Sequence, residues 1–293
     1  MAFALVTETM RAVNCNGRTG GPVKIFDPDI VTLLPSFQTA LIETHCHLDY
    51  LNDNDLDRAL ELARSVGIDR IITIAVSPDN LDTVIKIAAG HHQVWATQGI
   101  HPHEASAYSE TVHSKIEYQC QHSKVVAIGE IGLDYYYDHS DRQAQITAFE
   151  RQLDIAKAHN LPVVIHSREA DDDMLAILRE HAPSLDQKGV IHSFTSGQQL
   201  AEEALDLGFY LGFNGITTFK NAQNVRAIVK LAPIERIVLE TDSPYLTPAP
   251  FRGKPNAPHL LGLVAAQIAE IKALPIEVCL QTVRANSLRL FWN

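Results

Sequence analysis

The stretch Ala40-Leu41-Ile42-Glu43-Thr44-His45-Cys46-His47 joins a short apolar run to two histidines that are one residue apart. A run of this composition is typical of a buried strand. Alternate residues of an extended chain lie on one face, so His45 and His47 can present both imidazoles to the same point. Two neutral imidazoles make a natural first half of a metal site. Ordinary polar residues at a strand end would look the same, so the rest of the chain has to decide.

The same order of an apolar run, a turn and a helical pattern repeats along the chain. We predict strands at residues 40–44, 70–76, 94–97, 125–129, 162–165, 189–191, 209–212 and 236–241. We predict helices at residues 55–65, 78–89, 141–159, 169–181, 196–207 and 221–231, with two more after residue 259. Strands that are apolar throughout and alternate with helices indicate a parallel sheet covered on both faces. The sequence therefore predicts a (β/α)8 TIM barrel, with an open doubly wound sheet as the alternative.

Length and composition are compatible with one large domain. A chain of 293 residues with 46% hydrophobic content can fill a large core, and α/β barrels routinely use this length as a single domain. Residues 1–39 contain several glycines and prolines without sustained periodicity. We therefore predict an irregular extension over residues 1–39 and one hydrolase barrel over residues 40–293. The pattern does not distinguish a packed arm from a mobile tail or an artefact of start-site choice.

The charge and the cysteines restrict the partners and the compartment. A formal net charge of −11 argues against coating nucleic acid or an anionic membrane, so any nucleic acid would have to be held locally. The four cysteines form no Cys-x-x-Cys pair and no close framework, which fits a reducing compartment. No apolar run approaches the roughly 18 residues of a membrane span, and the start lacks a signal-peptide pattern. We expect a cytoplasmic protein without membrane contact, and no obligate protein partner is evident.

Six residues of metal-ligand type stand at the carboxyl ends of predicted strands. They are His45, His47, Glu130, His166, His192 and Asp242. In a (β/α)8 barrel these strand ends converge on the active-site face. The set exceeds the roughly four ligands of one tetrahedral zinc ion and suits two divalent ions about 4 Å apart, with Glu130 able to bridge them. Such a pair can activate a bridging water, which is the equipment of a hydrolase.

Six ordered motifs, followed by a basic loop, carry a family resemblance. They are His45-Cys46-His47-Leu48-Asp49, Gly99-Ile100-His101-Pro102-His103, Gly129-Glu130-Ile131-Gly132-Leu133-Asp134, His166-Ser167-Arg168-Glu169-Ala170, His192-Ser193-Phe194-Thr195-Ser196-Gly197, Glu240-Thr241-Asp242-Ser243-Pro244-Tyr245-Leu246 and the loop Arg252-Gly253-Lys254-Pro255-Asn256. Across residues 41–291 the chain resembles the TatD family of metal-dependent deoxyribonucleases, of the amidohydrolase-like superfamily. The resemblance implies a TIM barrel that hydrolyses phosphodiesters with divalent metal.

The resemblance also implies a ligand set and a substrate. The ligands of the first ion would be His45, His47 and Asp242, and those of the second would be His166 and His192, with Glu130 as the bridge. The ions would be Mg²⁺, Mn²⁺ or Zn²⁺, and the substrate would be single-stranded DNA cleaved from a free 3′ end. Two features depart from the family pattern: Glu43, where relatives usually carry Asp, and the extension before residue 40.

A mechanism and a set of substrate contacts follow as hypotheses. Asp242 would accept a proton from the metal-bound water, and hydroxide would attack phosphorus in line while Glu130 bridges the ions. Arg168 is placed to fork a phosphate, with a structural ion pair as the alternative. His101 and His103 are expected to contact substrate or to support neighbouring ligands, with surface histidines as the alternative. Arg252, Lys254 and Tyr245 are further expected substrate contacts, with solvated loop charges as the alternative for the two cations.

Neighbouring residues have supporting roles in this hypothesis. The aromatic run at residues 135–137 offers rings on which a base could stack, although such a cluster can also pack beneath its own loop. We expect Asp134 to orient a neighbouring ligand and Cys46 to point away from the metals.

Two other functions remain open. A small-molecule hydrolase of an ester or amide would share the fold and the paired histidines, and a site closed over a small cavity would favour it. A metal-binding scaffold without catalysis would bind metal but turn over no ester.

Overall fold

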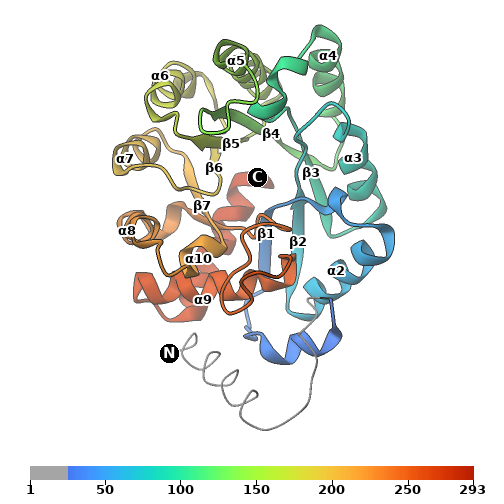
Figure 1. Ribbon diagram of the computed structural model, residues 1–293, viewed down its shortest axis with the longest axis vertical. Coiled ribbons are helices and arrows are strands. Elements are labelled where there is room, and N and C mark those ends of the chain that lie inside the picture. Colours follow the sequence, from blue (N-terminus) through green and yellow to red (C-terminus); the bar gives the residue numbers. More distant parts are fainter. Residues whose placement is uncertain (1–25) are drawn as a thin grey trace.

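Eight parallel strands form a barrel inside a ring of helices in the computed structural model, which describes residues 26–293 (Figure 1). The strands are β1 Leu41–Cys46, β2 Ile68–Thr73, β3 Val94–Gln98, β4 Val125–Asp134, β5 Val163–Arg168, β6 Gly189–Ile191, β7 Tyr210–Phe213 and β8 Ile237–Leu239. Each strand pairs with the next in sequence order. The last meets the first where the Asp242 N–H donates to the His45 carbonyl at 2.9 Å and the His47 N–H donates to the Ser243 carbonyl at 2.8 Å. The predicted TIM barrel is confirmed.

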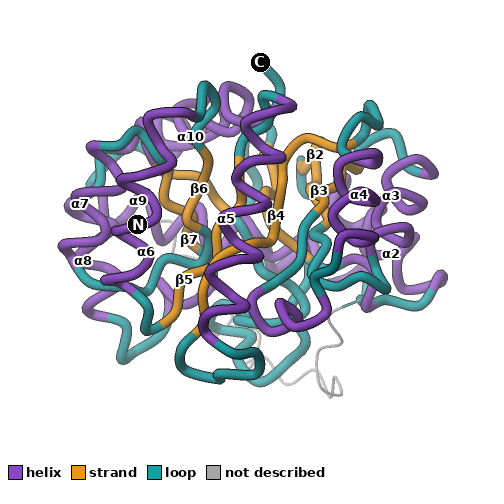
Figure 2. The backbone as a smooth tube through the Cα atoms, turned by 90° about the horizontal axis from the view of Figure 1, so that it is seen from above, coloured by secondary structure: helices purple, strands orange, loops and turns teal. Residues whose placement is uncertain are grey.

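Nine α-helices of the described residues cover the outside of the strands (Figure 2). They are α2 Asp53–Ser65, α3 Leu81–Gly90, α4 Glu110–Gln119, α5 Arg142–His159, α6 Asp171–His181, α7 Gln198–Asp206, α8 Gln223–Leu231, α9 Leu261–Lys272 and α10 Ile276–Phe291. Helix α4 was absent from the predicted set, because it buries only Ile116 and therefore shows little apolar periodicity. Within residues 26–293 no helix combines the length and apolarity needed to cross a bilayer.

The interior of the barrel is apolar, and its site lies at the carboxyl ends of the strands. Inward-facing residues such as Ile72, Val164 and Val238 form one cluster with Leu290 and Phe291 from the end of α10. Side chains of this kind fill a barrel of eight strands, so it is a packed core and no channel. The polar side chains described below therefore rest on this apolar core.

Strand β4 is longer than predicted and positions two carboxylates. The sequence predicts an end at residue 129, but the strand continues to Asp134 and is buried throughout. Its pairing with β5 has a register irregularity between Gly129 and Ile131, and the Glu130 N–H donates to the Ala75 carbonyl at 2.8 Å. Further along, Gly132 pairs with His166, and a Cβ at this glycine would lie 2.1 Å from the His166 carbonyl oxygen. Only glycine allows this approach of the two strands.

Residues 26–39 of the predicted extension pack against the barrel. The 3-10 helix η1, Pro28–Leu33, buries Ile30 in a cluster with Phe251 and Leu260. The backbone N–H groups of Gln38 and Thr39 donate to the Glu277 carboxylate of α10 at 2.8 and 3.1 Å. Residues 1–25 lie outside the described residues, so the division at residue 39 stays a prediction.

Candidate metal centre

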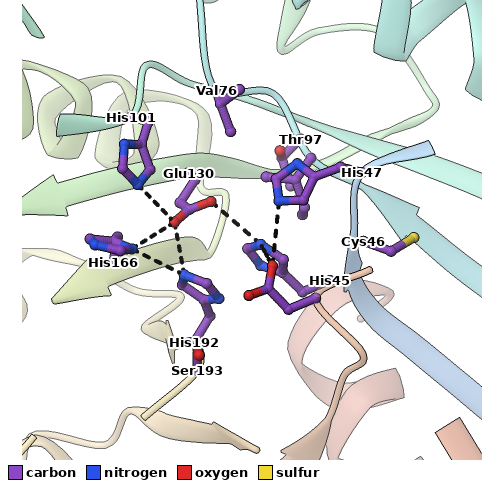
Figure 3. Close-up of polar contacts among 12 residues, drawn as sticks. His45, Cys46, His47, Val76, Thr97, His101, Glu130, His166, His192 and Ser193 are labelled. Carbon is purple, nitrogen blue, oxygen red and sulfur yellow. Dashed lines mark hydrogen bonds and ion pairs between the residues drawn. The ribbon is translucent and has the colours of Figure 1, made fainter. Parts of the chain in front are cut away.

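Glu130 stands at the centre of a buried cluster of imidazoles (Figure 3). Its Oε1 lies 2.8 Å from His192 Nε2, 2.9 Å from His166 Nδ1 and 3.3 Å from His101 Nε2. Its Oε2 lies 3.4 Å from His45 Nε2. The barrel thus brings side chains from β1, β4 and β5 together with side chains that follow β3 and β6.

Asp242 extends the cluster on the side of β1. Its Oδ1 lies 3.5 Å from His47 Nε2 and 3.7 Å from His45 Nε2. Asp242 has a φ of 58°, a backbone conformation that costs a residue with a side chain about 1–3 kcal/mol and that gathers at functional sites. Cys46 lies between the two histidines in sequence but points away from the cluster, as expected (Figure 3). Its thiol approaches the Ile72 carbonyl oxygen at 3.5 Å.

Three groups of ligand atoms are close enough to hold a metal ion. In each group the atoms lie within 4.8 Å of one another, and the groups are His45 with His47 and Asp242, His45 with Glu130 and His192, and His101 with Glu130 and His166. All six predicted ligands are therefore gathered. The grouping adds His101, which the sequence assigned to substrate, and it places His192 beside His45. The division of the ligands between two ions stays a prediction.

The chemistry of the cluster fits divalent cations. Nε2 of His45 faces Glu130 and Asp242 at 3.4 and 3.7 Å and is buried without a hydrogen-bond partner among the described residues. Buried polar atoms in proteins are nearly always satisfied, so this nitrogen needs an explanation. A cation supplies one, since imidazole and carboxylate together are the ligands of Zn²⁺, and carboxylates also suit Mg²⁺ and Mn²⁺.

The pKa shifts point the same way. Burial opposes ionisation of Glu130, but the neighbouring imidazoles of His192 and His101 outweigh it and hold its pKa well below the usual value. Burial also disfavours charge on His192, yet Glu130 outweighs this effect and raises the pKa of His192 well above the usual value. Burial is likewise outweighed at His47, whose pKa is raised by Asp242. The carboxylates thus create a negative potential that attracts protons and that a divalent ion would satisfy in their place.

Asp134 holds the imidazole of His166 in place, as the sequence suggested. Its Oδ2 lies 3.0 Å from His166 Nε2 and 2.9 Å from His103 Nε2, while its Oδ1 accepts the backbone N–H groups of Tyr136 and Tyr137 at 3.0 and 2.9 Å. Burial opposes its charge, but the hydrogen bonds from both imidazoles outweigh burial and lower its pKa. An ionised Asp134 accepts the hydrogen bond from His166 Nε2–H, which keeps the proton on Nε2 and leaves Nδ1, on the Glu130 side, free to bind metal.

Two buried carboxylates beneath the cluster were not predicted. Glu43 Oε1 accepts the N–H groups of His45 and Thr241, both at 3.0 Å. Glu240 Oε1 accepts the Ser193 N–H at 2.6 Å. Burial raises the pKa of Glu43 to about 8. The alternation of Glu43, His45 and His47 on one face of β1 was the signal that could have found the first of them.

The cluster opens into a mouth with a volume of about 1440 Å³. Of the predicted substrate contacts, His101, His103, Arg168 and Tyr245 line it. Tyr50 lines it too, and its half-exposed ring stacks on His47 with the centroids 5.2 Å apart. Tyr50 was not among the predicted site residues, although its position three residues after His47 places it at the same strand end.

The three predicted cationic residues lie in three different places. Arg168 lies over the rings of Tyr136 and Tyr137 at 4.2 and 4.8 Å. Within residues 26–293 no carboxylate pairs with Arg168, so the alternative of a structural ion pair is not seen there. Arg252 lines a neighbouring cavity, and Lys254 is exposed and lines neither of the two cavities.

Comparisons with known proteins agree with this geometry. The family model described as TatD related DNase matches residues 42–292. The chain is 38% identical over 252 residues to the "Uncharacterized metal-dependent hydrolase YabD" of Bacillus subtilis, covering 86% of this chain and 98% of that protein. It is 36% identical over 256 residues to YcfH of Escherichia coli, a protein of the same description, covering 86% of this chain and 95% of that one.

Solved structures show the same relationship. The crystal structure of YjjV, a TatD homologue from Escherichia coli, superposes with a TM-score of 0.81 at 31% identity, covering 86% of this chain and 97% of that one. A TatD family hydrolase from Entamoeba histolytica shares the fold, with a TM-score of 0.78 at 23% identity over 88% of this chain and 99% of that one. The match of the family model, the curated relatives and the clustered ligands lead to one conclusion: the chain belongs to the TatD family of metal-dependent hydrolases.

Proposed function

We propose that this protein is a deoxyribonuclease that shortens single-stranded DNA from its 3′ end with divalent metal. One observation carries the proposal: Arg168, which has no carboxylate partner within residues 26–293, lies over the rings of Tyr136 and Tyr137, and both Arg168 and Tyr137 line the mouth that contains the cluster. Arg168 can fork a phosphate, and exposed tyrosine rings can stack a base. A nucleotide needs both contacts beside the reacting centre.

The size of the mouth supports a polymeric substrate. Sites for small molecules commonly measure about 300–1,000 Å³. The mouth, at about 1440 Å³, is larger. Aromatic rings line it in two places, since Tyr50 and Tyr245 lie half exposed near His47, and Tyr135 and Tyr137 follow β4. A single strand can stack a base on either side of a phosphate held between them.

The cluster would hold two divalent ions, Mg²⁺, Mn²⁺ or Zn²⁺. The first would bind between His45, His47 and Asp242, and the second would bind to His166 and His192, with Glu130 shared and His101 as a further candidate ligand. When bound, divalent ions lower the pKa of water and neutralise charge on phosphoryl oxygens.

The chain's own residues would perform the remaining tasks. Asp242 would accept a proton from the attacking water on Oδ1, because its side chain is 14% exposed while that of Glu130 is only 4% exposed. Glu130 would hold the imidazoles around it by its charge. Arg168 would hold the phosphate for in-line attack. We place this activity in the cytoplasm, where the free thiols of Cys46, Cys120 and Cys279 would remain reduced.

Degradation of end-labelled single-stranded DNA tests the proposal. Purified protein with Mg²⁺ or Mn²⁺ is expected to shorten 5′-labelled strands stepwise, and EDTA or Glu130→Ala is expected to abolish shortening. Release of the 5′-terminal nucleotide first would contradict the polarity. Shortening that survives Glu130→Ala, or no shortening with either metal, would contradict the function itself.

A small-molecule ester or amide hydrolase is the second candidate. Carboxylates of Glu104, Glu169 and the α6 residues Asp171, Asp172 and Asp173 also line the mouth, and they oppose a polyanion. A panel of phosphoesters, lactones and amides under the same conditions separates the two, since turnover on the panel without DNA shortening would favour this reading. Bound metal without turnover on either would indicate the non-catalytic scaffold.

A further inference from the structure

A second cavity, with a volume of about 420 Å³, lies beside the mouth. Thr195 and Ile216 line both cavities, so the two are contiguous. The second is bounded by the segment after β7, by the first turn of α8 and by Arg252 from the segment after β8. None of the six predicted metal ligands lines it. A chain held at the cluster can therefore continue into a separate hollow.

The wall of this second cavity is held in a fixed shape. Arg226 of α8 donates through Nη1 to the carbonyl oxygens of Thr217 and Phe219, at 3.1 and 2.6 Å. The guanidinium of Arg252 lies 3.5 Å from the centroid of the Phe219 ring, a distance typical of close cation–π stacking. The segment after β8 thus meets the segment after β7 at this stack. The stacked guanidinium of Arg252 keeps its N–H edge available for a ligand.

The charge of the cavity is positive. Among residues 26–293 its lining contains Lys220 and Arg252 and no acidic residue. Both cations are exposed, and neither forms an ion pair with a carboxylate of residues 26–293. Arg226, in contrast, donates its hydrogen bonds to backbone carbonyl oxygens. In a chain with a net charge of −11, two unpaired cations in one hollow make a local site for an anion.

The mouth carries an excess of acidic groups on one side. The carboxylates of Glu104, Glu169 and Asp171, Asp172 and Asp173 line it around the carboxyl ends of β3 to β5, where the only lining cations among the described residues are Arg142 and Arg168. Because Arg168 is assigned to the reacting phosphate, the remaining negative charge disfavours the passage of a second phosphate on that side. The cavity beyond Thr195 and Ile216 offers the opposite charge. The two sides together give a bound strand a preferred exit.

We propose that this second cavity is a subsite for an internucleotide phosphate of the uncleaved part of the DNA strand, with Lys220 and Arg252 as its cations. The inference rests on the proposed function and adds a direction to it. The strand runs from the cluster over Thr195 and Ile216 toward α8, so that only its terminal nucleotide lies on the acidic side. A dinucleotide, with its single phosphodiester at the cluster, has no phosphate to place in this subsite.

Binding measurements on the metal-loaded protein test the subsite without relying on turnover. The ligands are a labelled dinucleotide and a labelled dodecamer, both with phosphorothioate linkages that resist cleavage. Their binding is measured by fluorescence anisotropy at several salt concentrations. The variant is Lys220→Ala with Arg252→Ala. Its matched control is Lys86→Ala with Arg289→Ala, which removes the same charge from exposed positions of α3 and α10.

The subsite variant is expected to weaken binding of the dodecamer by about tenfold, while binding of the dinucleotide changes less than about twofold. The slope of log affinity against log salt should become shallower by about 0.7 for each phosphate contact that is lost from a single strand. The control should match the parent with both ligands. Equal losses for the two lengths, or a subsite variant that matches its control, would overturn the inference.

The same experiment separates this inference from the proposed function. If the parent binds and shortens single strands but the subsite variant matches its control, only the subsite is wrong. If the parent binds neither oligonucleotide, both the function and the subsite are wrong.

Discussion

The floor of the mouth and its rim are built in different ways. The floor consists of side chains on or just after strands, such as His45, Glu130 and His192, which are buried and held by one another. The rim consists of partly exposed tyrosines and arginines at or after the strand ends, such as Tyr137 and Arg168. Changes to the floor should therefore alter metal binding and everything that depends on it, whereas changes to the rim should alter substrate binding alone.

The largest effect is expected from Glu130→Gln. The substitution keeps the size of the side chain but removes the charge that faces His45, His101, His166 and His192. Metal affinity should fall by more than the roughly 10–100-fold that follows loss of a merely supporting group. Calorimetric titration with Mn²⁺ measures this loss. Glu61→Gln, at an exposed position of α2, is the control. Unchanged Mn²⁺ affinity in Glu130→Gln would show that the floor is no metal site.

A smaller loss is expected from Asp134→Asn, which changes a supporting group. The amide can still accept the backbone N–H groups of Tyr136 and Tyr137, but it no longer carries the charge that holds His103 and His166. Metal affinity should fall about 10–100-fold. The reason is that His166 is no longer held in the tautomer with Nδ1 free. A change restricted to KM for DNA, with normal Mn²⁺ titration, would assign Asp134 to the rim instead.

A smaller effect again is expected at the rim, from Arg168→Ala. KM for single-stranded DNA should rise about tenfold, since a charged hydrogen bond to phosphate is lost from a half-exposed side chain. Metal affinity should match that of the parent. Arg168→Lys keeps the charge without the fork and should lie between the two. Loss of metal from Arg168→Ala would abolish the distinction between floor and rim.

The floor was largely predictable from the sequence because its geometry follows from regular structure. Alternation along β1 places His45 and His47 on one face, and a parallel barrel brings all strand ends to one side. These two rules gather ligands that lie almost two hundred residues apart. The error in this region concerns the length of a strand: β4 continues to Asp134, past its predicted end. The apolar run in the sequence does not indicate where the pairing of β4 with β5 stops.

The rim was less predictable because it depends on the conformation of loops. Arg252 was predicted to contact substrate, and the segment after β8 places it on Phe219 in the cavity beside the mouth. His101 was predicted to contact substrate or to support a ligand, and its Nε2 lies 3.3 Å from Glu130. Neither position follows from periodicity or spacing. Both are set by contacts between segments that are remote in sequence, such as the clamp of Arg226 on the loop after β7.

The smallest effect is expected in the pH dependence of the free energy of unfolding, which again distinguishes the floor from the rim. Burial raises the pKa of Glu43 from 4.5 to about 8, so the folded metal-free protein holds a proton here that the unfolded chain releases above its ordinary pKa. The contribution of this group to the free energy of unfolding should therefore fall as the pH rises from about 5 to about 8, by at most about 1.4 kcal/mol per pH unit. His47 and His192, whose pKa values are raised, add to this trend, whereas His45 and His101, whose pKa values are lowered by burial, oppose it below about pH 6.5. Glu43→Gln should give a shallower decline in urea unfolding with EDTA, while the rim variant Arg168→Ala should keep the slope of the parent. If Glu43→Gln also kept that slope, this carboxyl would be ionised at neutral pH in the folded protein. That result would contradict the raised pKa of Glu43 and would add one negative charge to the buried floor.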